Sequence, residues 1–124
     1  MVLTGENRLP EEILKRGLSI RQPHSELILI GKKKREYRRR LTHIRGRVYL
    51  YAGKKLDLDV KGITNDEAAL LPRSAIVGSV EIIGCCESQD HPGYFEWQLA
   101  DPIRYPEPLE PAGVPQPGFW HPKF

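Results

Sequence analysis

The hydrophobic residues of this chain recur mainly with the two-residue period of β-strands. Alternating runs at residues 18–21 and 47–52 place apolar side chains on one face, and both are predicted to be strands. The longest apolar run, residues 75–87, contains two glycines that permit a bulge or bend. Further strands are expected at residues 94–100 and 103–106. The chain is therefore predicted to be rich in β-structure.

Three segments carry the signals of short helices instead. Residues 10–17 begin with proline and acids and end with glycine, and residues 23–30 begin with proline and stop at Gly31. Residues 64–67, Thr-Asn-Asp-Glu, form a capping box that opens a third helix. Short, mostly antiparallel strands with a few short flanking helices indicate an α+β fold built around a small β-barrel.

The length of 124 residues is enough for one hydrophobic core and one domain. Residues 1–9 are expected to form a flexible leader, and residues 10–124 a single folded domain. No apolar run approaches the roughly 20 residues that a membrane-spanning helix needs. The first ten residues also lack the layout of a signal peptide.

The two cysteines, Cys85 and Cys86, are neighbours in the sequence. Adjacent cysteines rarely form a disulfide because the geometry is strained, and strand alternation would point one inward and the other outward. This pattern favours a reduced, cytoplasmic setting. Neither the cysteine pair nor the spacing of the four histidines indicates a metal site, and no cofactor is expected.

Positive charge is concentrated in one part of the sequence. The chain carries a formal net charge of +3, yet residues 32–47 contain nine basic residues and one acid, Glu36. This window carries +8, so the rest of the chain is net negative. Such an uneven distribution is typical of a surface that contacts phosphate groups. The basic residues are Lys32, Lys33, Lys34, Arg35, Arg38, Arg39, Arg40, Arg45 and Arg47.

Residues 34–40 are predicted to form a strand, because a helix with so many cations would repel itself. Alternation would place Glu36, Arg38 and Arg40 on one face, and Lys33 would lie within reach of it. A guanidinium suits a phosphate or a base edge, an ammonium supplies a point charge, and a carboxylate can accept from an amino group. In the alternative interpretation, Glu36 only neutralises Arg38, and the remaining cations form a solvated surface.

Aromatic residues lie beside and beyond the basic segment. Tyr37, Tyr49 and Tyr51 are candidates for stacking on a base, which contributes about 1–3 kcal/mol per base. Trp97, in the middle of a predicted strand, and Trp120, in a Gly-Phe-Trp segment, are expected to pack in the core.

Polar residues at the end of the first strand leave two interpretations open. Ser19 and Gln22 would either bond a base edge or cap the helix that follows. A nuclease would find a candidate general base in His24 or His43, although nothing in the sequence positions either of them.

A spaced pattern, G-x-K-x-x-E-x-R, is formed by Gly31, Lys33, Glu36 and Arg38. It is accompanied by L-S-I-R-Q-P at 18–23, R-G-R-V-Y-L-Y-A at 45–52, V-G-S-V-E at 77–81 and G-F-W at 118–120. Taken in this order, the blocks resemble the ASCH domain family, whose signature is that pattern, over residues 17–121. The resemblance implies a PUA-like β-barrel that binds RNA or DNA in a cleft beside the barrel, where the motif residues lie.

One enzymatic branch of that family resembles an amidohydrolase of acetylated cytidine, which uses a lysine, a threonine three residues later and a more distant glutamate. Lys33 matches the lysine, but Glu36 stands in the position of the threonine. The nucleophile is therefore missing, and the activity is not carried over. If the cleft were catalytic, Lys33 and Glu36 would be the candidates. Many relatives also carry Trp where this chain has His24, so no stacking role is carried over to that position.

The prediction is a monomeric nucleic-acid-binding domain, with RNA slightly favoured over DNA. It would contact the phosphate backbone in a basic cleft that also suits a base. Two alternatives stay open: a ribonuclease or hydrolase of modified nucleosides in the same cleft, and a module whose basic patch binds an acidic protein. The expected binding residues are Ser19, Arg21, Gln22, Lys32, Lys33, Lys34, Glu36, Arg38, Arg40, Arg45 and Arg47.

Overall fold

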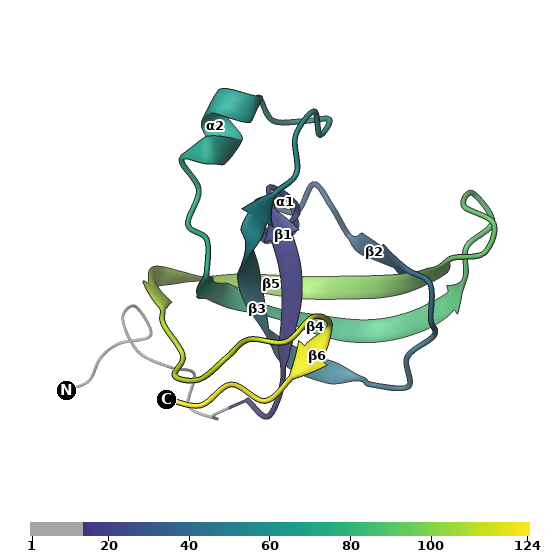
Figure 1. Ribbon diagram of the computed structural model, residues 1–124. Coiled ribbons are helices and arrows are strands. Elements are labelled where there is room, and N and C mark those ends of the chain that lie inside the picture. The colour runs from purple at the N-terminus through teal and green to yellow at the C-terminus, as the bar shows by residue number, and fades with distance from the viewer. Residues whose placement is uncertain (1–13) are drawn as a thin grey trace.

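The computed structural model describes residues 14–124, which form one six-stranded sheet and two short helices (Figure 1). The elements are β1 (Gly17–Gln22), α1 (His24–Leu29), β2 (Arg35–Arg38), β3 (Gly46–Leu56), α2 (Asn65–Ala69), β4 (Ala75–Glu87), β5 (Phe95–Leu109) and β6 (Phe119–Trp120). In the sheet, the strands lie in the order β2-β5-β4-β3-β1-β6. β1 runs parallel to β3, and every other neighbouring pair is antiparallel.

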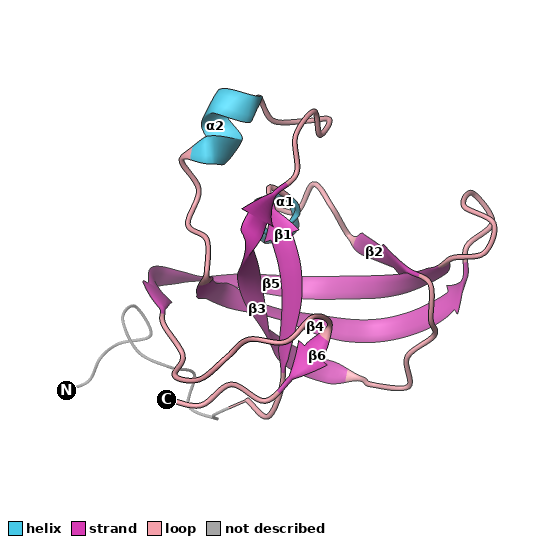
Figure 2. Cartoon of the chain, in the orientation of Figure 1, coloured by secondary structure: helices cyan, strands magenta, loops and turns pink. Residues whose placement is uncertain are grey.

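Strands make up most of the regular structure, and the two helices are small additions to it (Figure 2). α1 directly follows β1, and α2 stands away from the sheet in the connection between β3 and β4 (Figure 1). The capping box predicted at residues 64–67 is present, because the Thr64 hydroxyl accepts from the amide of Glu67 and the Glu67 side chain accepts from the amide of Thr64. The helix end predicted before Gly31 is also found, and Gly31 has a φ of 80°.

The sequence predicted two strands at residues 94–100 and 103–106, but both belong to the single strand β5. The pairing of β5 with β4 shifts register three times along its length. Asp101 adopts a φ of 49° immediately before Pro102, at one of these irregular stretches. Such bulges let a strand continue through a proline that would interrupt regular pairing.

The helix predicted over residues 10–17 is wrong for the part that the structure describes. Residues 14–16 are not helical, and Gly17 begins β1. The amide of Leu14 donates to the hydroxyl of Tyr49 at 3.2 Å, and the carbonyl of Arg16 accepts from the amide of Tyr49 at 2.9 Å. This segment therefore bonds to β3 instead of to itself. The rest of that helix and the leader at residues 1–9 lie outside the described residues.

β3 is buried on both of its faces, which accounts for its continuous apolar sequence. Val48 and Leu50 pack in the main core, which also contains Trp97. Tyr49 and Tyr51 point the other way, into a second cluster with Trp120 and Tyr105. The predicted alternation is therefore confirmed, as is the core packing of both tryptophans.

The sheet curls into a half-barrel and does not close into the barrel that the sequence predicted. Its edge strands, β2 and β6, are only four and two residues long and do not pair with each other. A side chain crosses the opening instead: Nη2 of Arg38, on β2, donates to the carbonyl oxygen of Ser19, on β1, at 2.9 Å. The architecture is consistent with a PUA-like α+β fold that is open on one side.

Candidate functional site

A cleft of about 900 Å³ lies at the opening of the half-barrel. β1, β2 and β3 line it together with residues 115–118, which follow β5 in the sequence. A volume of this size is in the range of sites that bind small ligands. The charged and histidine residues in its lining are Arg21, His24, Lys33, Glu36, Arg38, Lys54, Lys55 and Asp57.

Glu36 is the centre of the polar network in this cleft. Its Oε1 accepts from Nζ of Lys33 at 3.0 Å, and its Oε2 accepts from Nε of Arg38 at 2.8 Å. The Glu36 side chain is only 10% exposed, so the two cations neutralise a carboxylate that is largely removed from water. This is the neutralising contact of the alternative interpretation, and it also fixes both cations at the cleft.

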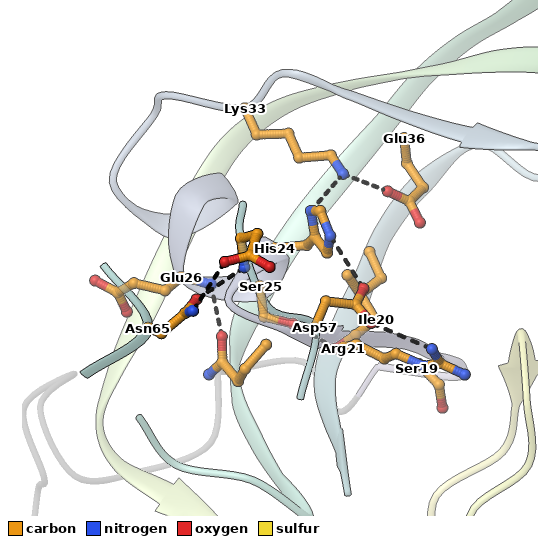
Figure 3. A network of polar contacts seen from close by, with 12 residues as sticks. Ser19, Ile20, Arg21, His24, Ser25, Glu26, Lys33, Glu36, Asp57 and Asn65 are labelled. Atoms are coloured by element: carbon orange, nitrogen blue, oxygen red, sulfur yellow. Dashed lines mark hydrogen bonds and ion pairs between the residues drawn. The ribbon is translucent and has the colours of Figure 1, made fainter. Parts of the chain in front are cut away.

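His24, at the start of α1, extends this network on the other side of Lys33 (Figure 3). The Lys33 ammonium lies 3.1 Å from Nδ1 of His24, and Nε2 of the same ring lies 3.1 Å from Oδ2 of Asp57. Asp57 in turn accepts from Nη1 of Arg21 at 3.2 Å. The network therefore joins residues from β1, α1, β2 and the segment after β3.

Burial lowers the pKa of the His24 imidazole below its usual value of 6.5, and the nearby Lys33 ammonium acts in the same direction. The carboxylates of Glu36 and Asp57 oppose this shift without overcoming it. A neutral ring fits the contacts, because Nδ1 can then accept from Lys33 while the Nε2 proton is donated to Asp57. We therefore assign the Nε2-protonated tautomer to His24.

The central groups keep hydrogen-bonding capacity that a ligand can use. An ammonium has three donors, and Lys33 uses two of them, on His24 and Glu36. Arg38 uses Nε and Nη2, and its Nη1 donates to no other residue within the described part of the chain. Each Glu36 oxygen can accept a second bond. The cleft therefore offers donors for a phosphate or carbonyl oxygen beside an acceptor for an amino group.

The Arg38 guanidinium also packs over the aromatic ring of Trp97. Its Cζ lies 5.5 Å from the centroid of the Trp97 ring, and Phe119 stacks on the same ring with centroids 5.2 Å apart. Nε1 of Trp97 donates to the carbonyl oxygen of Arg40 at 3.0 Å, which fixes the indole. Trp97 therefore packs in the core and positions Arg38 as well.

Ser19 and Gln22 are used by the protein itself. The Ser19 hydroxyl donates to the carbonyl oxygen of Gln116 at 2.8 Å and accepts from Nε1 of Trp120 at 2.9 Å, which ties residues 115–118 to β1. Gln22 is 1% exposed, and its side-chain oxygen accepts from the amide of Glu26 within α1. Of the two interpretations, the contacts of Gln22 are those of a helix cap.

The remaining predicted binding residues do not line this cleft. Lys32 and Lys34 lie on an adjacent groove, and Arg40 is exposed. Arg45 donates to the carbonyl oxygens of Thr42 and Ile44. Arg47 donates to the hydroxyl of Ser79 and the carbonyl oxygen of Asp101 on the β4–β5 side of the sheet. The cationic run is thus divided between several surfaces.

The stacking candidates are divided in the same way. Tyr37 and Tyr51 line the cleft, whereas Tyr49 is fully buried in the second core cluster. Stacking by Tyr49 was therefore a wrong prediction, because a strand covered on both faces leaves no ring free. Cys85 is partly buried and Cys86 is exposed, as strand alternation predicted.

Several residues of the cleft were missed in the sequence. Lys54, Lys55 and Asp57 follow the predicted strand at 47–52, where the chain was expected to have left the sheet. The continuation of β3 to residue 56 brings them to the cleft, and the two lysines were the only local signal. Residues 115–118 carry no charged group that would have marked them.

The protein-family comparison identifies the fold family. The model of the ASCH domain matches residues 18–109, which is most of the chain. The chain belongs to the ASCH domain family. ASCH domains are PUA-like and often linked to RNA binding, and the matched region contains every strand of the cleft. Residues 115–118 lie beyond the match.

One solved structure confirms the architecture of this ASCH domain. The crystal structure of a mutant of ZmASCH from Zymomonas mobilis aligns with a TM-score of 0.55 and 16% sequence identity, covering 86% of each chain. At this identity the likeness concerns the fold alone. A comparison with curated proteins found no match.

Two further observations concern the described residues 14–124. Their helices, of six and five residues, are too short to cross a membrane. No group of three or more His, Cys, Asp or Glu side chains in this part of the chain is arranged to hold a metal ion.

Proposed function

We propose that this ASCH domain binds nucleic acid, RNA in preference to DNA, in the cleft at the opening of the half-barrel. The observation that carries the proposal is the mixed set of donors and acceptors formed by Lys33, Glu36 and Arg38. These three residues also belong to the G-x-K-x-x-E-x-R pattern, so the sequence resemblance and the geometry support the same binding residues.

The carboxylate distinguishes a nucleotide ligand from a simple anion. A site for phosphate alone gains nothing from Glu36, because a second negative charge would be repelled. A base, however, carries amino or imino groups that donate to a carboxylate, beside ring and carbonyl acceptors that suit Lys33 and Arg38. Lys54, Lys55 and Arg21 add positive charge to the same cleft for the phosphate.

The preference for RNA follows from the acceptors. A ribose 2′-hydroxyl can donate to a carboxylate oxygen of Glu36 or Asp57, and DNA lacks this group. The partly exposed aromatic ring of Tyr37, in the same lining, can pack against a base.

The test is fluorescence anisotropy with short RNA and DNA strands of the same sequence, at a series of salt concentrations. We expect tighter binding to RNA, and a loss of about tenfold for Arg38→Ala or Lys33→Ala, since each removes charge-assisted bonds to the ligand. Lys15→Ala is the matched control, because this exposed cation lies outside the cleft lining. Circular dichroism checks that the variants are folded.

The absence of binding at low salt would overturn the proposal. Equal effects of the cleft variants and the Lys15 control would do the same, because they would show that only the overall charge matters. Recovering the RNA intact after the titration would show that the measured signal reports binding and not cleavage.

A further inference from the structure

A second hollow, of about 520 Å³, adjoins the cleft and is called the lysine groove below. It lies between the turn that joins α1 to β2 and the segment that follows β3. His24, Lys33 and Tyr37 line both hollows, so the lysine groove and the cleft meet at a shared wall. The residues lining the lysine groove are His24, Leu27, Lys32, Lys33, Lys34, Arg35, Tyr37, Val60 and Lys61.

The two hollows differ in charge. Five cations line the lysine groove, and no Asp or Glu is among its lining residues. The cleft, in contrast, contains the carboxylates of Glu36 and Asp57 beside its cations. The charged side chains of the lysine groove are therefore all hydrogen-bond donors, which suits the acceptor-only oxygens of a phosphodiester.

The local backbone explains how the lysines are brought together. The carbonyl oxygen of Leu27 accepts from the amides of both Lys32 and Lys33, at 2.9 and 3.0 Å. This tight turn, with Gly31 at a φ of 80°, projects three successive lysines beyond the end of α1. Lys61, in the connection between β3 and α2, lines the same groove.

Acids lie close to some of these cations without lining the groove, and Lys33 pairs with one of them, Glu36, at 3.0 Å. Arg35 forms an ion pair with Glu96 at 3.4 Å on the neighbouring strand β5. Lys32 is near enough to Glu67 to contribute to the lowering of the pKa of that carboxyl. Lys34 and Lys61 form no ion pair within residues 14–124. Arg35 is therefore partly neutralised, and Lys32, Lys34 and Lys61 are the cations to test.

We infer that the lysine groove binds the phosphodiester backbone that flanks a nucleotide held in the cleft, and that the ligand is therefore a single strand several nucleotides long. This inference rests on the proposed function. The cleft offers hydrogen bonds to a base edge, and in a duplex that edge is occupied by its partner base. The shared wall at Lys33 is where the base-binding and phosphate-binding parts meet.

The experiment compares a dinucleotide and a hexanucleotide of RNA, with wild type and the double variant Lys32→Ala/Lys61→Ala. Removing one phosphate contact on a single strand lowers affinity about fivefold at 0.1 M salt and reduces the salt slope by about 0.7. We expect the double variant to bind the hexanucleotide about 25-fold more weakly, with a slope smaller by about 1.4. Its affinity for the dinucleotide should stay within about twofold of wild type, because the single phosphodiester of a dinucleotide would lie at Lys33 on the shared wall and leave Lys32 and Lys61 without a phosphate.

Lys33→Ala separates this inference from the proposed function. It should weaken both ligands, since Lys33 belongs to the cleft as well as to the groove. If wild type binds neither ligand, the proposed function and this inference fail together. Suppose that wild type binds both ligands. If the double variant then leaves both affinities unchanged, or weakens both by the same factor, only this inference fails.

Two competitors complete the test. A duplex of the hexanucleotide should compete poorly, and competition equal to that of the single strand would overturn the inference. Polyglutamate of matched charge should also compete poorly, and equal competition would assign the lysine groove to acidic protein instead. Both lysines are exposed, so thermal unfolding of the double variant should match that of wild type.

Discussion

Nδ1 of His24 accepts from the ammonium of Lys33 at 3.1 Å, which requires that this ring nitrogen carry no proton. The relationship makes the histidine part of the support for the cleft: its other nitrogen is anchored to Asp57, so the ring holds Lys33 in place opposite Glu36. Protonating the ring would set two cations against each other. The cleft is therefore sensitive to pH at one identified group.

The first prediction concerns this titration. Because the pKa of His24 is lowered in the folded chain, the unfolded chain binds the proton first as the pH falls below 6.5. The stability that His24 contributes is thus present above pH 6.5 and lost below it, until the folded-state pKa is reached. Urea unfolding at neutral and at mildly acidic pH should show a larger loss for wild type than for His24→Gln.

His43→Gln provides the control for this experiment, because His43 is exposed and lies outside the cleft lining. Nitrogen chemical shifts of the His24 ring report its tautomer directly. A titration midpoint above 6.5, or a proton on Nδ1 at neutral pH, would contradict the assignment.

The second prediction concerns the buried carboxylate. Glu36→Gln removes the charge that Lys33 and Arg38 share, and leaves both cations partly desolvated without a counterion. We expect the free energy of unfolding to fall by about 2 kcal/mol, as for the loss of a charged hydrogen bond. Urea denaturation measures the change.

Glu81→Gln is the matched control for that substitution. The Glu81 carboxylate is 37% exposed and lies 3.8 Å from Arg47, so its loss should cost less than about 0.5 kcal/mol. Equal effects of the two substitutions would show that the burial of Glu36 does not matter.

The third prediction concerns close packing at Gly78 on β4. A Cβ at this position would overlap the carbonyl oxygen of Ile103 and lie 2.9 Å from a methyl group of Leu29. Because backbone cannot move aside cheaply, Gly78→Ala should destabilise the protein by about 3 kcal/mol. Gly53→Ala should have little effect, since nothing lies within 4 Å of its Cβ. Thermal unfolding compares the two, and similar melting temperatures would refute the prediction.

The fourth prediction concerns the cap of α2. Thr64→Ala removes the hydroxyl that accepts from the amide of Glu67 and should cost about 1 kcal/mol, whereas Thr64→Ser keeps it. The bonds from Thr64 also lower the pKa of Glu67, so their stabilisation is present above pH 4.5 and lost as the pH falls below it. Hydrogen exchange of the α2 amides measures the effect, and equal protection in both variants would argue against the cap.

Local features of the fold were readable in the sequence because they depend on neighbours in the chain. The alternation of β3 and the Thr64–Glu67 box needed only spacings of two and three residues. The stretch from Lys33 to Arg38 was readable for the same reason, because Glu36 contacts both cations within three positions of itself.

The open side of the sheet was not predictable in this way. It depends on contacts such as that from the Ser19 hydroxyl to Gln116, which joins residues 97 positions apart. The anchor of His24 on Asp57 is another, because nothing in the run at 54–57 indicates that β3 is long enough to carry it there. Hydrophobic periodicity predicts which face of a strand is apolar, but it does not predict which distant segment covers that face.

The wall formed by residues 115–118 has a consequence for the order in which the site is built. Ribosomes make this segment after all the strands that carry the cleft cations. A nascent chain that has emerged as far as β5 can already pair β1 to β5 and bring Lys33, Glu36 and Arg38 together. The cleft then stands open along one side until Gln116 and Gly118 reach Ser19. The binding site is therefore completed only after β1 to β5 have been made.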